Sequence, residues 1–161
     1  MFAIRAILHP TDFSEPSEYA FGLTCALARD HGARVVLFHV AMPVVVMEGV
    51  LLQESPEESR QKLWDAFHRL EKSDPKVREL RIETKLAEGE PATEILRAAR
   101  EIQPDLIVMG THGRTGLTRL LMGSVAEAVL RKAPCPVLTV KAPAPGTRTK
   151  EAAHAEEMVT A

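Results

Sequence analysis

Strand-like and helix-like segments alternate along this chain, and the alternation limits the fold more than any other feature does. Residues 35–40, Val-Val-Leu-Phe-His-Val, are apolar and rich in β-branched side chains, a pattern typical of a strand buried on both faces. Similar runs recur along the chain. The predicted strands are 4–9, 35–40, 80–87, 105–109 and 136–141.

Helical patterns fill most of the intervals, and the predicted helices are 15–30, 55–72, 91–102 and 125–132. Strands separated by helices favour a parallel sheet with right-handed crossovers and helices on both faces. Residues 41–54 fit neither a strand nor a helix template, because Pro43 and Gly49 interrupt an apolar run. Open parallel sheets bind ligands at the carboxyl ends of their strands. The unusual segments 10–14, 41–54 and 110–124 all fall at that edge of the predicted sheet.

Length and charge narrow the class of protein. The 161 residues suffice for one domain with a sizeable core, and the net charge of −2 argues against a protein that coats nucleic acid. No apolar run approaches the roughly 18 residues of a membrane span, and no secretory leader is recognised, so we expect a cytoplasmic protein. Residues 142–161 lack a core pattern and predict a flexible tail after a domain of residues 1–141.

The connection between the predicted strand 105–109 and the predicted helix 125–132 is the most informative segment for function. It contains Gly110, Gly113, Gly116 and Gly123, and it is longer than the roughly two to six residues of an ordinary strand-to-helix connection. Glycine lets the main chain approach a ligand closely, and a helix N-terminus offers unpaired N–H groups to an anion. We therefore predict a phosphate cradle, with a nucleotide as the first hypothesis.

Several residues at that edge have a structural interpretation beside the functional one. Ser124 and Glu127 have the spacing of a capping box, and Asp12 with Ser14 would cap the first helix. Alternatively, the Asp12 carboxylate would accept hydrogen bonds from ribose hydroxyls or from an adenine amino group. Arg114 is either a phosphate contact or an ordinary surface arginine.

Motifs of other chemistries are absent from the sequence. Neither the P-loop pattern nor G-x-G-x-x-G after the first strand occurs. His9 and His39 end the first two predicted strands, and a hydrogen-bonding role is favoured over a metal site because no carboxylate–histidine spacing accompanies them. Cys25 and Cys135 lack metal-binding spacing and are predicted to pack in the interior.

Six sequence motifs together make the chain resemble the universal stress protein family over roughly residues 2–141. They are Ile-Leu-His-Pro-Thr-Asp-Phe-Ser at 7–14, Val-Leu-Phe-His-Val at 36–40, Gly-Glu-Pro-Ala at 89–92, Asp-Leu-Ile-Val-Met-Gly-Thr-His-Gly-Arg at 105–114, Gly-Ser-Val-Ala-Glu at 123–127 and Ala-Pro-Cys-Pro-Val-Leu-Thr-Val at 133–140. The family's ATP-binding members carry G-x2-G-x9-G-[ST]. Gly110, Gly113, Gly123 and Ser124 match every fixed position of that pattern.

The resemblance implies a Rossmann-like α/β fold of the adenine nucleotide alpha-hydrolase type, with five parallel strands in the order 3-2-1-4-5. It also implies an ATP site in which Mg²⁺ or Mn²⁺ is held by the phosphates rather than by a protein cage. The residues carried over to that site are Pro10, Thr11, Asp12, Val40, Met109, Gly110, Gly113, Arg114, Gly123, Ser124 and Val125. A homodimer through residues 136–141 is implied as well, since two-fold pairing covers an apolar edge strand.

Three functions stay open on the sequence. The first is an ATP-binding module that reports on energy or stress status. The second is a slow ATPase or an autophosphorylating enzyme, for which the chain offers no distinctive catalytic base and lacks the P-loop lysine. The third is an interaction protein that keeps the motif without binding nucleotide. AMP or a cyclic nucleotide is an alternative ligand, and no role is assigned to 41–54 or to the tail.

Overall fold

The computed structural model describes residues 3–41, 45–47, 50–52, 55–73, 75–111 and 122–143. The strands are β1 (Ala6–Thr11), β2 (Arg34–Ala41), β3 (Val45–Met47), β4 (Val50–Leu52), β5 (Ile82–Glu88), β6 (Leu106–Gly110) and β7 (Val137–Val140). The helices are α1 (Glu15–His31), α2 (Pro56–Ser73), α3 (Pro91–Ile102), α4 (Ser124–Lys132) and the 3₁₀ helix η1 (Pro75–Glu79).

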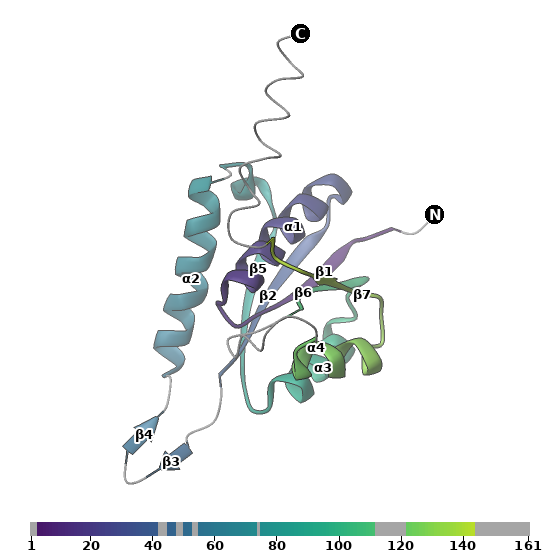
Figure 1. Cartoon of the computed structure of the whole chain (residues 1–161). Helices are drawn as coiled ribbons and strands as arrows, with labels where there is room; N and C mark the ends of the chain where they lie inside the picture. Colours follow the sequence, from purple (N-terminus) through teal and green to yellow (C-terminus); the bar gives the residue numbers. More distant parts are fainter. Residues whose placement is uncertain are drawn as a thin grey trace.

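Five of these strands form one parallel sheet in the order β5-β2-β1-β6-β7 (Figure 1). Counted along the chain without the short pair β3 and β4, this is the predicted order 3-2-1-4-5, so the predicted fold is confirmed. From β1 the chain builds outward through β2 to β5, and it then crosses to β6 on the other side of β1. The order of the strands therefore reverses between β1 and β6.

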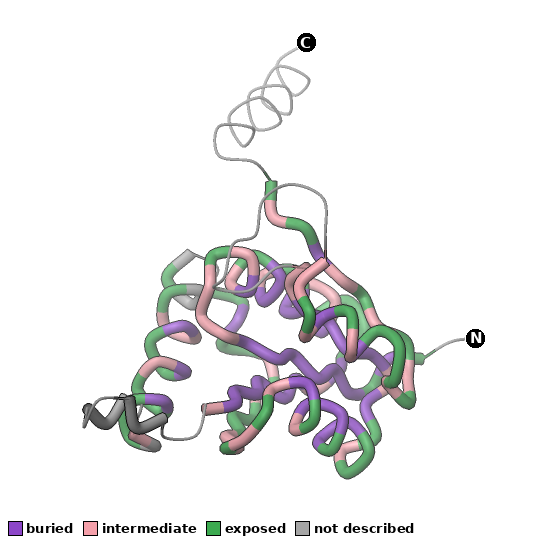
Figure 2. Tube along the Cα trace, turned by 60° about the horizontal axis from the view of Figure 1, so that its bottom comes forward, coloured by how far each residue is buried: buried purple, intermediate pink, exposed green. Residues whose placement is uncertain are grey.

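Two apolar clusters cover the two faces of the sheet, because successive side chains of a strand point to opposite faces. Val35 and Leu37 of β2 pack with Leu63 of α2 in the first cluster, which also contains residues of α1. Val36 packs with Ile95 of α3 in the second cluster, which reaches α4. Buried strands accordingly run between two layers of helices (Figure 2).

The helix ends follow capping rules that the sequence shows. The Ser14 side chain accepts from the N–H of Ser17 at the start of α1, and α1 ends at Gly32, whose φ of 65° favours glycine. A capping box begins α2, since Ser55 N–H donates to the Glu58 carboxylate and Glu58 N–H donates to Ser55 Oγ.

Some predicted boundaries were wrong. Pro10 and Thr11, which lie beyond the predicted strand 4–9, belong to β1 because they stay in register with Phe38 and His39 of β2. The third strand of the sheet begins at Ile82 rather than at residue 80, because η1 extends to Glu79 and the N–H of Leu80 bonds back to the Val77 carbonyl. Residues 45–47 and 50–52, which fitted no template, pair as antiparallel strands.

Other predictions about the chain as a whole are tested only in part. No helix in the described ranges is both long and apolar enough to cross a membrane. The predicted tail, residues 142–161, falls outside the described residues from 144 onward. The division into a domain of residues 1–141 and a tail stays a prediction.

Candidate functional site

The carboxyl edge of the sheet opens between β1 and β6. The β1–β6 ladder stops at Leu8↔Ile107, whereas the β1–β2 ladder continues to Thr11↔His39 and the β6–β7 ladder continues to Gly110. The ends of the two central strands therefore diverge where the strand order reverses. Open parallel sheets bind their ligands in this position.

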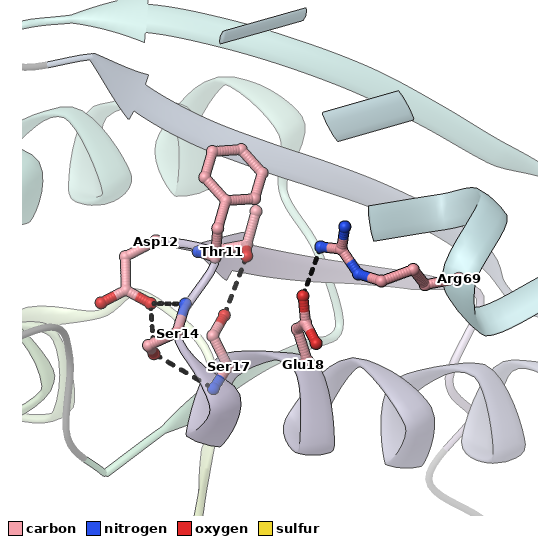
Figure 3. A network of polar contacts seen from close by, with 7 residues as sticks. Thr11, Asp12, Ser14, Ser17, Glu18 and Arg69 are labelled. Carbon is pink, nitrogen blue, oxygen red and sulfur yellow. Dashed lines mark hydrogen bonds and ion pairs between the residues drawn. The ribbon is translucent and has the colours of Figure 1, made fainter. Parts of the chain in front are cut away.

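One side of the opening is the turn from β1 into α1, and hydrogen bonds fix its shape (Figure 3). Asp12 Oδ1 accepts from the N–H of Ser14 at 3.1 Å and from its Oγ at 2.6 Å. Thr11 Oγ1 accepts from the N–H of Phe13 at 3.1 Å and from Ser17 Oγ at 2.9 Å. Phe13, with φ of 62°, adopts the left-handed conformation. The turn is thus fixed on both sides of the Asp12 carboxylate.

An ion pair holds the two helices beside this turn together. The Glu18 carboxylate of α1 pairs with the Arg69 guanidinium of α2 (Figure 3). Because both side chains are partly exposed to solvent, we assign the pair only a small contribution to stability. The apolar cluster that α1 and α2 share on one face of the sheet accounts for their placement.

Two buried histidines support the strand ends from the α1 face. His39 Nδ1 lies 2.8 Å from the carbonyl oxygen of Thr11, and the ring of Phe13 packs against the imidazole with centroids 4.4 Å apart. His9 Nδ1 lies 2.8 Å from the carbonyl oxygen of Val108. Burial lowers the pKa of His9 to about 4, so its ring is neutral at pH 7.

The predicted hydrogen-bonding role of both histidines is confirmed by these contacts. Each imidazole bonds a main-chain carbonyl of the neighbouring strand rather than facing the other imidazole as a shared metal site would require. Within the ranges that the structure describes, no three His, Cys, Asp or Glu side chains gather closely enough to hold a metal ion.

The opposite face of the opening is apolar. Val40 at the end of β2 and Met109 near the end of β6 belong to the same buried cluster, and Val125 of α4 packs against it. Pro10 follows Leu8 by two residues in β1, so its ring lies on the same face of the sheet. Four of the predicted ATP-site residues thus lie on the same face of the sheet.

The two ends of the long connection from β6 to α4 meet. The N–H of Thr111 donates to the carbonyl of Val140 at 2.9 Å, and the N–H of Gly123 donates to the carbonyl of Thr111 at 2.8 Å. The first turn of α4 therefore begins directly beside the end of β6. Gly113, a predicted phosphate contact, and Arg114, predicted to lie near the nucleotide, are outside the described residues.

The N-terminus of α4 differs from those of the other three α-helices that the structure describes. Ser14, Ser55 and Glu90 provide side-chain acceptors to α1, α2 and α3, but α4 begins at Gly123 without a side-chain cap. Its first N–H groups are left with the partial positive charge of the helix end. An anion is the ligand that such a helix end accepts.

The predicted capping box at Ser124 is wrong. The Glu127 N–H bonds the carbonyl of Gly123, so Gly123 is the cap and Ser124 already lies in the first turn. The Glu127 carboxylate pairs with Arg131 one turn further on. Ser124 is the first residue of α4, so its hydroxyl lies at the N-terminus that has no side-chain cap.

Gly110 has a structural explanation that the sequence did not reveal. A Cβ atom at this position would lie 3.2 Å from the main-chain carbon and oxygen of Pro16 and 3.3 Å from the nitrogen of Ser17. The first turn of α1 therefore packs directly on the β6 backbone, as only glycine allows without displacement. Sequence reasoning also missed Phe13 and Ser17, for which the spacing Thr-x-x-Ser-x-x-Ser was the only signal.

Comparisons with known proteins agree with the fold. The sequence model of the universal stress protein family matches residues 3–141. Universal stress protein MJ0531 of Methanocaldococcus jannaschii is 39% identical over 142 residues, which cover 86% of this chain and 83% of that protein.

Solved structures give the same result. The structure of the hypothetical protein MJ0577 is similar with a TM-score of 0.64 and 30% identity, covering 88% of this chain and 98% of that one. The universal stress protein from Archaeoglobus fulgidus in complex with dAMP has a TM-score of 0.60 at 24% identity, covering 88% and 100% of the two chains. At that identity the likeness shows a shared fold.

Proposed function

Because this chain belongs to the universal stress protein family, we propose that it is an ATP-binding module whose nucleotide state reports on energy or stress status. One observation carries the proposal. The uncapped N-terminus of α4 is bonded to the end of β6 through Gly123 and Thr111, at the edge where β1 and β6 diverge. A phosphate group is the anion that best suits a helix end at a strand-order reversal.

The two faces of the opening suit the two ends of the nucleotide. The apolar face with Val40 and Met109 offers a surface on which an adenine ring can pack. The Asp12 carboxylate, held by Ser14, is a hydrogen-bond acceptor suited to ribose hydroxyls. The proposed phosphate contacts are Gly110, Gly113, Gly123, Ser124 and Val125, with Arg114 nearby, and Pro10 and Thr11 complete the adenosine side.

A divalent cation is part of the proposal. We propose that Mg²⁺ or Mn²⁺ binds to phosphate oxygens of the nucleotide, in keeping with the preference of these ions for phosphate and water oxygens. The protein's contribution is the helix N-terminus, which offers main-chain N–H groups to the same phosphates. Similar universal stress protein structures hold dAMP and cAMP, so adenine and a single phosphate, rather than the triphosphate, are the elements these ligands share.

We also propose that the protein is a homodimer through β7. This strand pairs with β6 on one side and, within the described residues, with no strand on the other. Leu138 is 37% exposed, so an apolar side chain accompanies the open edge. A second copy of the same strand satisfies the edge N–H and C=O groups by two-fold pairing.

A cytoplasmic location completes the proposal. Cys25 and Cys135 are both free thiols, as is usual for proteins of a reducing compartment. The likeness to nucleotide-bound relatives favours the cytoplasm too, because ATP is available there.

The test uses Gly123. In Gly123→Asp the carboxylate would cap α4, since φ of −59° and ψ of 146° suit an N-cap aspartate, but it would repel a phosphate at the same N–H groups. We expect the variant to unfold at a higher temperature than wild type and to lose ATP affinity by more than about tenfold, or 1.4 kcal/mol. Isothermal titration calorimetry with ATP and Mg²⁺, beside thermal unfolding, measures both.

Gly123→Asn is the matched control, because it also caps the helix without adding charge. We expect it to weaken ATP binding less than the aspartate does. Wild-type affinity in Gly123→Asp would contradict the proposed phosphate site. Formation of ADP by the wild-type protein over hours would add hydrolysis to the binding function, and an absence of ATP binding by wild type would favour the nucleotide-independent interaction protein.

A further inference from the structure

The end of the β1–β6 ladder has an identifiable chemical cause. The Ala6 carbonyl accepts from the N–H of Asp105, and the Arg5 carbonyl accepts from the N–H of Arg34 in β2. Because main-chain groups alternate along a strand, even-numbered residues of β1 face β6 and odd-numbered residues face β2. The next β1 residue that faces β6 after Leu8 is Pro10.

Proline has no N–H to donate. If the register Leu8↔Ile107 continued, the carbonyl of Val108 would accept from the N–H of residue 10, one position beyond its partner His9. Pro10 cannot supply that bond. The imidazole of His9 supplies it instead, since its Nδ1 lies 2.8 Å from the Val108 carbonyl oxygen.

We propose that His9 is a positioning residue for the nucleotide site: its side chain replaces the main-chain donor that Pro10 lacks and fixes the separation of β1 and β6 at the mouth of the site. The bond spans the divergence on the α1 face. It therefore does not occupy the opposite face, with Val40 and Met109, where the adenine ring is proposed to pack. This inference rests on the proposed function for its ligand and on the sheet geometry for its mechanism.

The surroundings of the ring determine its tautomer. Thr24 Oγ1 lies 3.2 Å from His9 Nδ1, but its hydroxyl proton is donated to the carbonyl of Ala20 at 2.9 Å. Both neighbours of Nδ1 are therefore acceptors, and Nδ1 must carry the proton. Phe21 stacks on the ring with centroids 5.2 Å apart, which holds it in the plane that aims Nδ1 at Val108.

Two variants, each with a side-chain amide as hydrogen-bond donor, test whether the position of the donor at residue 9 matters. In His9→Asn the side-chain amide nitrogen takes the place of Nδ1, whereas in His9→Gln it reaches the place of Nε2. We expect His9→Asn to keep ATP affinity within about threefold of wild type and His9→Gln to lose about tenfold or more. Calorimetry with ATP and Mg²⁺ measures the affinity of each full-length variant.

A second measurement needs no nucleotide. Amide proton and nitrogen shifts of Thr11, Asp12, Gly110 and Thr111 report on the two strand ends in the free protein. We expect them to move in His9→Gln and to stay near wild type in His9→Asn. If wild type fails to bind ATP, the proposed function falls, and these shifts alone decide whether His9 sets the strand ends.

A control variant distinguishes positioning from general loss of stability. Val77→Ala removes buried methyl groups from η1, a segment that is not part of the site, and we expect it to lower thermal stability without changing ATP affinity. Equal affinity and equal shifts in His9→Asn and His9→Gln would overturn the role of His9. Equal weakening of ATP binding by Val77→Ala and His9→Gln would overturn it as well.

Discussion

The main-chain N–H of Gly123 donates to the carbonyl oxygen of Thr111 over 2.8 Å, although residues 112–122 lie between them in the chain. The end of β6 and the start of α4 are therefore adjacent in space, although a long connection separates them in the chain. The geometry of the strand-to-helix junction does not need the intervening residues. The proposed nucleotide site would account for their length and glycine content.

Replacement of residues 112–122 by Asn-Gly tests this explanation. Two residues between Thr111 and Gly123 form a β-turn that keeps the observed carbonyl-to-N–H bond. We expect the variant to fold and to lose about 1 kcal/mol from the missing contacts of Met122, which packs partly buried against the core. ATP affinity should disappear in calorimetry. A variant that binds ATP as tightly as wild type would show that the loop takes no part in binding.

Two glycines of the motif should respond to alanine with opposite signs. Gly110→Ala places a Cβ atom against the backbone of Pro16 and Ser17, and we expect a loss of about 1–3 kcal/mol in the free energy of unfolding. Gly123 has φ of −59°, which alanine adopts without strain, so Gly123→Ala should be neutral or stabilising by up to about 1 kcal/mol. Urea denaturation compares the two, and equal losses would contradict the distinction.

Acid should destabilise the protein through His9. Burial lowers the pKa of His9 from 6.5 to about 4, so the unfolded chain binds a proton more readily than the folded one between these values. The contribution of His9 to stability is therefore complete above pH 6.5 and falls as the pH drops towards 4. A shift of this size corresponds to about 3 kcal/mol.

The matched variant for this experiment is His9→Asn, which cannot titrate. Urea denaturation at several pH values should show a steeper fall for wild type than for the variant between pH 6.5 and 4. The Asp105 carboxyl affects the measured stability only at the acid end of this pH range, because the N–H groups of Arg5 and Ala6 hold its pKa below the usual 3.8. Parallel profiles for the two proteins would rule out a buried, neutral His9.

Proline substitutions in β7 should separate dimer from fold. The carbonyls of Pro136 and Val140 bond residues of β6 and its continuation, so the odd-numbered residues of β7 face the open edge. Thr139→Pro removes an edge donor and leaves the β6 ladder intact. We expect a folded monomer for this variant by light scattering, and a dimer for wild type.

Leu138→Pro is the control for Thr139→Pro. It removes a donor that faces β6, and we expect a loss of stability rather than a simple change of oligomeric state. A dimer that survives Thr139→Pro would contradict the proposed pairing through β7.

Much of the fold was predictable from local pattern. The apolar, β-branched run of β2 and the capping box of Ser55 and Glu58 each identify an element from neighbouring residues alone. The strand order came from the family resemblance, and the structure agrees. The boundaries that were wrong, at Pro10 and at Ser124, depend on partners distant in the chain. β2 holds Pro10 in a strand, and Gly123, bonded to Thr111, caps α4 so that the helix begins at Ser124, one residue earlier than predicted.

The sequence by itself determined the alternation of elements, the caps of α1 and α2 and the glycine spacing, because each follows from residues a few positions apart. Only the tertiary structure decided what Gly110 and His9 do. Gly110 is required by the backbone of α1, and His9 replaces a donor that proline removes from the ladder. Both roles depend on which strands and helices become neighbours. The sequence alone does not show which main-chain carbonyl or which backbone segment will lie beside a given residue.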